Sequence, residues 1–168
     1  MPDTDRHDDA PNAAAKNTHG EREIASHAVT INRPLDEVFG LYADLTKAPL
    51  YMDGVERVDV DGSRAHWVTE QGEWDAEITK LVPGQEMYWQ AEESSGRAVF
   101  QEVAGRGTIV TLTMAYEQGF LAKIAAKLSQ KDPSIQSRRN LRRLKQLLET
   151  GEIATNARNR RMQAEENV

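Results

Sequence analysis

The chain has 168 residues, which is enough for one domain of ordinary size. It contains no cysteine, so disulfides, thiol nucleophiles and thiolate metal sites are excluded. Its formal net charge of -6 argues against general nucleic-acid binding, because binding to a phosphate backbone requires a basic face.

Both ends of the chain are polar. Residues 1–22 contain no aromatic residue and no Ile, Leu or Val, so they cannot bury enough apolar surface to offset the entropy of ordering. We therefore expect a disordered polar tail at 1–22, one domain at 23–151 and a second polar tail at 152–168. No apolar run reaches the length of a signal peptide or a membrane span, which predicts a soluble, cytoplasmic protein.

The domain is predicted to begin with a strand and two short helices. Residues 24–31 alternate in polarity and are rich in β-branched side chains, as expected for a strand. Pro34 suits the first position of a helix, and an apolar stripe continues that helix over 34–43. A second short helix is expected over 45–51, with Pro49 inside it leaving its shape open.

Six further strands are predicted, with no helix among them. Turn signals such as Ser95-Gly96 recur at the close spacing of consecutive hairpins. The cleanest alternation lies at 73–82, where Trp74 and Ile78 face one side and acidic residues face the other. We place the strands at 55–60, 64–70, 73–82, 86–93, 97–103 and 108–118.

The rest of the domain is predicted to be helical. Apolar residues recur at helical spacing over 120–128, and a break follows near Lys131. Asp132 is a suitable N-cap and Pro133 a suitable first residue for a second, longer helix, which Gly151 ends. Such a helix can cross a whole sheet. The order predicts an α+β fold in which a curved antiparallel sheet grips the final helix and leaves a hollow beside it.

This order of elements resembles the helix-grip fold of the START-like (SRPBCC) superfamily, in its bacterial polyketide cyclase/dehydrase-like branch of the coenzyme Q-binding type. The resemblance implies a seven-stranded antiparallel sheet wrapped around the C-terminal helix, with a cavity for lipids, quinones, polyketides or other apolar molecules. It does not imply a reaction. The break at 130–135 departs from the unbroken helix expected of the family. The segments that carry the resemblance are Tyr51 to Val58, His66-Trp67-Val68, Glu73 to Ile78 and Arg139 to Glu149.

The expected wall of the cavity consists of aromatic, thioether and aliphatic side chains. Aromatic rings offer a large apolar contact with little loss of entropy, and methionine adapts to irregular ligands. The alternative interpretation of the same residues is an ordinary packed core. A shift of one residue in its strand would replace Trp67 by His66 and Val68. The predicted ligand-binding residues are Tyr51, Trp67, Trp74, Met87, Trp89, Phe100, Leu112, Met114, Leu121, Ile124 and Leu144.

No catalytic motif accompanies these residues. His27 and His66 lie on separate predicted strands without the spacing of a metal site, so we expect neither a metal nor another cofactor. Asp75 and Glu77 share one face of a strand. We expect that face to be outside, because burying two adjacent carboxylates without partners costs several kcal/mol.

Three functions remain open. The leading hypothesis is binding of a hydrophobic small molecule, with no protein partner identified. An enzyme of the cyclase, aromatase or dehydratase type would use the same cavity, with His66, Tyr88, Arg97 or Tyr116 as candidates for proton transfer. The third is an interaction module that binds an acidic partner through the basic face of the last helix; the alternative is that this face is merely solvated. The basic residues are Arg138, Arg139, Arg142, Arg143 and Lys145.

Overall fold

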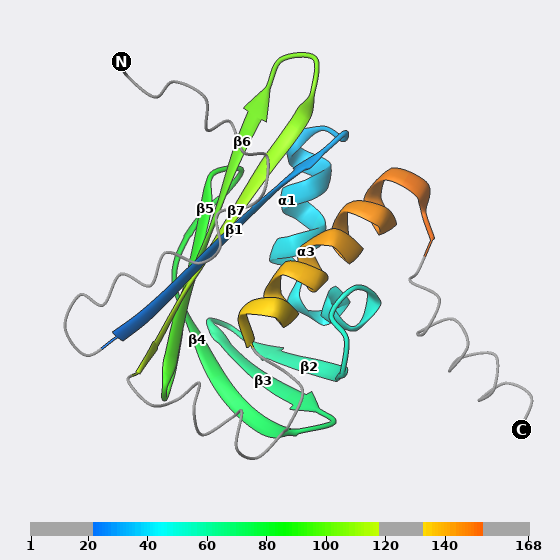
Figure 1. The fold of residues 1–168 in the computed structure, drawn as a ribbon. Helices are drawn as coiled ribbons and strands as arrows, with labels where there is room; N and C mark the ends of the chain where they lie inside the picture. Colours follow the sequence, from blue (N-terminus) through cyan, green and yellow to red (C-terminus); the bar gives the residue numbers. More distant parts are fainter. Residues whose placement is uncertain (1–21, 118–132, 153–168) are drawn as a thin grey trace, which may run out of the picture.

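The computed structural model describes residues 22–117 and 133–152, and Figure 1 shows how their elements are arranged. Seven strands, two α-helices and one 3-10 helix make up this part of the chain. In chain order they are β1 (Arg22–Ile31), α1 (Leu35–Ala43), the 3-10 helix η1 (Leu45–Leu50), β2 (Val55–Asp61), β3 (Arg64–Thr69), β4 (Gly72–Val82), β5 (Glu86–Ala91), β6 (Ser94–Val103), β7 (Gly107–Glu117) and α3 (Pro133–Thr150).

All seven strands form one antiparallel sheet in the order β1-β7-β6-β5-β4-β3-β2. Strands β2 to β7 are joined as a run of hairpins, and β1 pairs with β7 along its whole length, from Arg22 opposite Glu117 to Ile31 opposite Thr108. The sheet is curved, and α1, η1 and α3 all lie on the same side of it (Figure 1). The predicted α+β helix-grip architecture is confirmed.

The structure defines the shape of the second helical segment, which the sequence had left open. Residues 45–50 form a 3-10 helix, because Pro49 within them has no backbone N–H to donate to an α-helical hydrogen bond. The Asp44 carboxylate begins this segment by accepting a hydrogen bond from the Thr46 backbone N–H at 3.2 Å. The helix expected over 120–128 and its break near Lys131 lie outside the described residues.

Polar contacts fix the C-terminal end of α3 to the end of β1. The Arg33 guanidinium donates hydrogen bonds to the backbone oxygens of Leu148 at 2.7 Å and Glu149 at 3.0 Å, which satisfies carbonyl groups that the end of a helix leaves unpaired. The Glu149 carboxylate accepts from the Asn32 backbone N–H at 2.9 Å. Gly151 ends the helix with φ 70, the left-handed conformation that glycine adopts at low cost.

A second set of contacts fixes the middle of α3 to the turn after η1. Arg143 forms an ion pair with Asp53 at 3.4 Å, and both side chains are about 85% shielded from solvent, with exposures of 14% and 15%. The Asn140 side-chain oxygen accepts from the Asp53 backbone N–H at 3.2 Å. Together, the two sets of contacts hold α3 in place at its middle and at its C-terminal end.

The basic face of α3 is therefore only partly solvated, which corrects the prediction that all five basic residues share one role. Arg143 pairs with Asp53, and Lys145 pairs with Glu149 at 2.8 Å. Arg138, Arg139 and Arg142 are exposed. Neither α1 nor α3, nor any shorter helical segment in the described ranges, combines the length and apolarity that a membrane crossing requires.

Candidate functional site

The register of the sheet places the predicted tryptophans on one face. Residues directly opposite one another on paired strands share a face. Trp67 of β3 lies opposite both Val58 of β2 and Trp74 of β4, and Ile78 of β4 lies opposite Trp89 of β5. Val58 belongs to the buried cluster that contains the apolar residues of α3, so this is the face that the helices cover.

The same face continues across β6, β7 and β1. Trp89 lies opposite Gly96, Gly96 opposite Met114, and Met114 opposite Ala25, so these residues form one row across the sheet. The next row consists of Met87, Ala98, Leu112 and His27.

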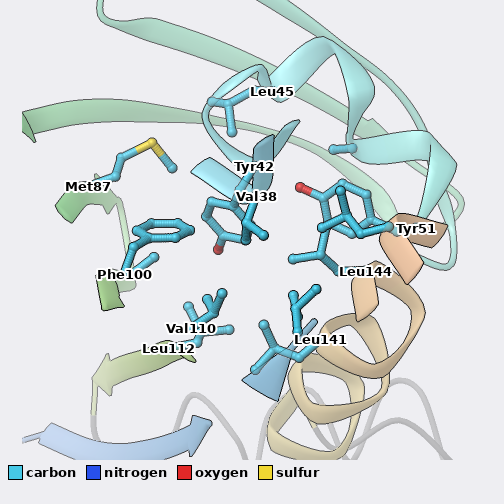
Figure 2. Close-up of a cluster of buried hydrophobic side chains, with 14 of the residues drawn as sticks. Val38, Tyr42, Leu45, Tyr51, Met87, Phe100, Val110, Leu112, Leu141 and Leu144 are labelled. Carbon is cyan, nitrogen blue, oxygen red and sulfur yellow. The ribbon is translucent and has the colours of Figure 1, made fainter. Parts of the chain in front are cut away.

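The middle of this face is filled by a closely packed group, which we call the central cluster. Figure 2 shows side chains from the sheet, α1, η1 and α3 converging on it. Val38, Val110 and Leu144 have no exposed surface, and the Phe100 ring packs edge-on against Tyr42 with centroids 5.5 Å apart. The central cluster consists of Val38, Tyr42, Leu45, Tyr51, Met87, Phe100, Val110, Leu112, Leu141 and Leu144.

One end of the helix-covered face remains partly open. The Trp67 and Trp74 rings stack with centroids 6.3 Å apart and planes 10° from parallel, and Trp74 keeps 44% of its surface exposed. Ile78, Trp89 and Met114 are only partly buried where they pack against the central cluster. We call these five residues the tryptophan surface: Trp67, Trp74, Ile78, Trp89 and Met114.

Gly96 allows Trp89 to lie flat on the sheet. A Cβ atom at position 96 would be 2.2 Å from Cζ2 of Trp89, so the indole occupies the space that any other residue would fill. The prediction that Ser95-Gly96 forms a turn is therefore wrong, since both residues lie inside β6. A glycine inside a strand often marks a position where another group approaches the backbone closely, and Gly96 is such a position rather than a turn.

Two tyrosine hydroxyls lie inside the central cluster. The Tyr42 and Tyr51 rings are stacked at 6.3 Å, with exposures of 4% and 2%, and Figure 2 shows the Tyr51 oxygen directed toward the middle of the cluster. The described residues offer the Tyr51 hydroxyl no hydrogen-bond partner. Burial, with smaller contributions from Tyr42 and Asp44, holds the pKa of Tyr51 well above its ordinary value, so the phenol stays neutral and can donate.

His27 is a polar residue of the helix-covered face that was not among the predicted site residues. It is buried on β1 directly opposite Leu112. Because side chains alternate along a strand, His27 shares a face with Val29 and Ile31, so the sequence contained the signal. Apart from the buried tyrosines, His27 and Thr108 are the buried polar residues of the described chain.

The residues considered for proton transfer divide between the two faces. His66 lies on the outer face, where its Nδ1 is 2.8 Å from the Asp75 carboxylate and its Nε2 is 3.6 Å from Glu73. The hydrogen bond to Asp75, with a smaller contribution from Glu73, raises the pKa of His66. Asp75 and Glu77 are exposed as expected.

A second outer-face group contains two of the other candidates. The Tyr88 hydroxyl donates to Glu86 at 3.3 Å and accepts from Arg97 at 3.4 Å, and Lys80 pairs with Glu86. Tyr116, opposite Ser94 of β6, lies on the helix-covered face and is buried. Of the four candidates, the structure thus places Tyr116 alone on the side of the predicted cavity. Within residues 22–117 and 133–152, no group of three or more histidine or acidic side chains could hold a metal ion.

The structure brings most of the predicted ligand-binding residues onto the helix-covered side but divides them between two regions. Tyr51, Met87, Phe100, Leu112 and Leu144 belong to the central cluster, and Trp67, Trp74, Trp89 and Met114 belong to the tryptophan surface. Leu121 and Ile124 lie outside the described residues. Contact of any of these residues with a ligand stays a prediction.

Comparison with known proteins gives a family and a set of similar folds. Residues 22–149 match the family model described as polyketide cyclase / dehydrase and lipid transport. The crystal structure of DR_A0006 from Deinococcus radiodurans is similar at 30% identity and a TM-score of 0.59, covering 77% of this chain and 99% of that one. The Aha1 dimer from Colwellia psychrerythraea is similar at 16% identity and a TM-score of 0.63, covering 77% and 98%.

A further similar structure is the di-domain ARO/CYC protein BexL from the BE-7585A biosynthetic pathway. It is 19% identical with a TM-score of 0.55, and the match covers 73% of this chain and 47% of that one. No curated protein matches the chain. The family model spans nearly all of the described fold, and the sheet order and the long final helix agree with it. The chain therefore belongs to the polyketide cyclase/dehydrase and lipid transport family, within the START-like (SRPBCC) superfamily.

Proposed function

We propose that the protein binds a hydrophobic small molecule, such as a lipid, a quinone or a polyketide-like chain, between the sheet and α3. The observation that carries this proposal is the tryptophan surface. Three indoles, an isoleucine and a methionine gather at one end of the helix-covered face and remain partly exposed. Grouped apolar side chains that keep their solvent contact mark binding surfaces more often than scattered ones do.

The arrangement of the rings suits a flat or chain-like apolar ligand. Stacked Trp67 and Trp74 present one broad ring surface, and Trp89 lies flat over Gly96 in the adjoining part of the sheet. Covering such rings removes a large apolar area from water, and each ring loses little rotamer entropy. The family includes lipid transport in its description, which supports a hydrophobic ligand.

Removal of one exposed ring tests the proposal. We expect Trp74→Ala to weaken binding of 2-ethylnaphthalene about tenfold, because tryptophan is enriched among the contacts whose truncation costs more than about 1 kcal/mol. Isothermal titration calorimetry measures the affinity. Leu81→Ala is the matched control, since Leu81 is also exposed, at 50%, but lies at the far end of β4. Failure of the wild-type protein to bind any apolar probe, or equal weakening by both variants, would contradict the proposal.

A second candidate is a cyclase, aromatase or dehydratase that uses the same region. The observation that favours it is the presence of Tyr51, Tyr116 and His27 on the otherwise apolar helix-covered side. Such an enzyme would fold a flexible poly-β-ketone so that a carbonyl and a nucleophilic carbon meet, and one polar group would assist proton transfer. The similar protein BexL is a di-domain ARO/CYC. Incubation with a linear poly-β-ketone thioester, followed by mass spectrometry, should then give ring products faster than the protein-free control does.

A further inference from the structure

The Tyr51 hydroxyl is a buried polar group without a hydrogen-bond partner among the described residues. Its side chain is 2% exposed, and none of the described residues exchanges a hydrogen bond with its oxygen. Nearly all buried polar atoms in folded proteins are paired, because an unpaired one forfeits the hydrogen bonds that it makes to water when unfolded. An unpaired buried hydroxyl therefore indicates either a strained site or a partner that the free chain lacks.

The surroundings define the chemistry of that partner. Tyr51 lies against Tyr42 and Leu144 in the central cluster, and no Lys, Arg, Asp or Glu is among the buried residues that the structure describes. A charged ligand group would lose its hydration there without gaining a counter-charge. The phenol stays neutral and offers one O–H donor, so a neutral oxygen acceptor is the complementary group.

The position of Tyr51 also connects it to the tryptophan surface. Trp67 lies opposite Val58, and Val58 belongs to the same buried group as Tyr51, against which Trp67 packs. The segment η1 that leads into Tyr51 packs on β2, the strand that carries Val58. The tryptophan surface and Tyr51 therefore adjoin the same buried residue, Val58, and a ligand whose apolar body lies on that surface reaches the Tyr51 hydroxyl when side chains of the packed cluster move aside.

We propose that Tyr51 donates a hydrogen bond to a neutral carbonyl oxygen, of a ketone, quinone or ester, at one end of the apolar ligand. This inference rests on the proposed function and adds the chemical class of the ligand. Fully saturated or purely aromatic hydrocarbons would lack the group that Tyr51 recognises, and fatty-acid carboxylates would carry a charge that this site does not balance.

The experiment uses two probes of the same shape on the full-length chain. 2-Acetylnaphthalene carries a carbonyl acceptor, and 2-ethylnaphthalene replaces it with a methylene group. Calorimetry gives the ratio of their affinities for the wild-type protein and for Tyr51→Phe, which removes only the hydroxyl. We expect the wild-type protein to favour 2-acetylnaphthalene over 2-ethylnaphthalene, and we expect this preference to be about fivefold smaller in Tyr51→Phe. A change of about fivefold is the effect of one neutral hydrogen bond. Tyr88→Phe removes an outer-face hydroxyl and should leave the ratio unchanged.

A thermal melt of the free protein separates ligand recognition from a structural role. Because Tyr51→Phe removes a hydroxyl without a partner among the described residues, the melting temperature of the ligand-free variant should be equal to or above that of the wild type. A lower melting temperature would show that the hydroxyl is already paired, for instance with a buried water, and would overturn the inference. Binding of both probes with an unchanged ratio would overturn it as well. If the wild type binds neither probe, the proposed function itself fails.

Discussion

Gly96 shows how a single residue shapes the site. Replacement of Gly96 by alanine puts a methyl group where the Trp89 indole lies, so either the ring or the β6 backbone must move. We expect Gly96→Ala to lower the free energy of unfolding by about 1 to 3 kcal/mol, the usual cost of overpacking. Urea denaturation measures this change, and a shift in tryptophan fluorescence should accompany it.

Gly40 in α1 provides the control for this prediction. A Cβ atom there meets nothing within 4 Å, so Gly40→Ala adds a methyl group without a clash. Because alanine favours a helix interior, we expect this variant to be more stable by about 0.5 to 1 kcal/mol. Equal effects of the two substitutions would show that the indole of Trp89 does not rest on Gly96.

The strand alternation predicted which side chains share a face, but not how deeply each is buried. Because side chains alternate along a strand, Trp74 and Ile78 were correctly assigned to one face. The 44% exposure of Trp74 and the full burial of Leu144 depend on how the helices pack on the sheet, which no local pattern contains. Likewise, the unpaired Tyr51 hydroxyl follows from packing between segments that are distant in sequence.

The attachment of α3 to the sheet is a property of whole elements. The Arg143–Asp53 pair joins α3 to the turn before β2, and both side chains are largely shielded from solvent. Arg143→Ala removes one partner of a shielded ion pair, which costs more than removal of an exposed charge. We expect a loss of about 2 to 4 kcal/mol in the free energy of unfolding, measured by urea denaturation.

Arg142 is the matched control on the same helix, since it is exposed. Arg142→Ala should change the free energy of unfolding by less than about 0.5 kcal/mol. A loss of similar size in both variants would indicate that the ion pair with Asp53 does not determine the effect.

The bounds of α3 could be predicted because the residues that begin and end a helix act through the local backbone conformation. Pro133 at the first position and Gly151 after the last turn gave the helix its predicted length, and Gly151 adopts the expected left-handed conformation. The interior ion pair was not predictable, because all five basic residues of the helix look alike in sequence. Which of them faces Asp53 depends on the rotation of α3 about its own axis, which tertiary packing sets.

For the whole molecule, the order of elements determined the topology more reliably than any motif did. Successive hairpins leave few ways to arrange β2 to β7, and β1 forms the edge strand beyond β7 by pairing with it. The same overall structure also determines how stability depends on pH, since two carboxylates, Glu86 and Glu149, are ionised more easily when folded. Hydrogen bonds from Lys80 and Lys145 hold the pKa of Glu86 and of Glu149 below their ordinary value of 4.5.

The acid side of the stability curve follows from the sign of these shifts. A carboxyl whose pKa is lower in the folded state stabilises the protein above its unfolded pKa, and this contribution is lost as the pH falls through the folded value. We expect Glu149→Gln to be less stable than the wild type at pH 7, with the deficit shrinking as the pH falls below about 4.5. Urea denaturation across this range measures the difference, and a deficit that is constant with pH would contradict the assignment.

His66 gives the stability of the protein the opposite dependence on pH in the neutral range. Its pKa is raised above 6.5 chiefly by the hydrogen bond to Asp75, so its contribution to stability is fully present below pH 6.5 and is lost as the pH rises through the higher, folded value. Asp75→Asn removes the main cause of that shift and should flatten the decline of stability above pH 6.5. Glu77→Gln is the control, because Glu77 is also exposed on β4 but lies opposite Arg64 rather than His66. NMR titration of the His66 ring should show its pKa moving toward 6.5 in Asp75→Asn and staying raised in Glu77→Gln, since the His66–Asp75 contact is intact there.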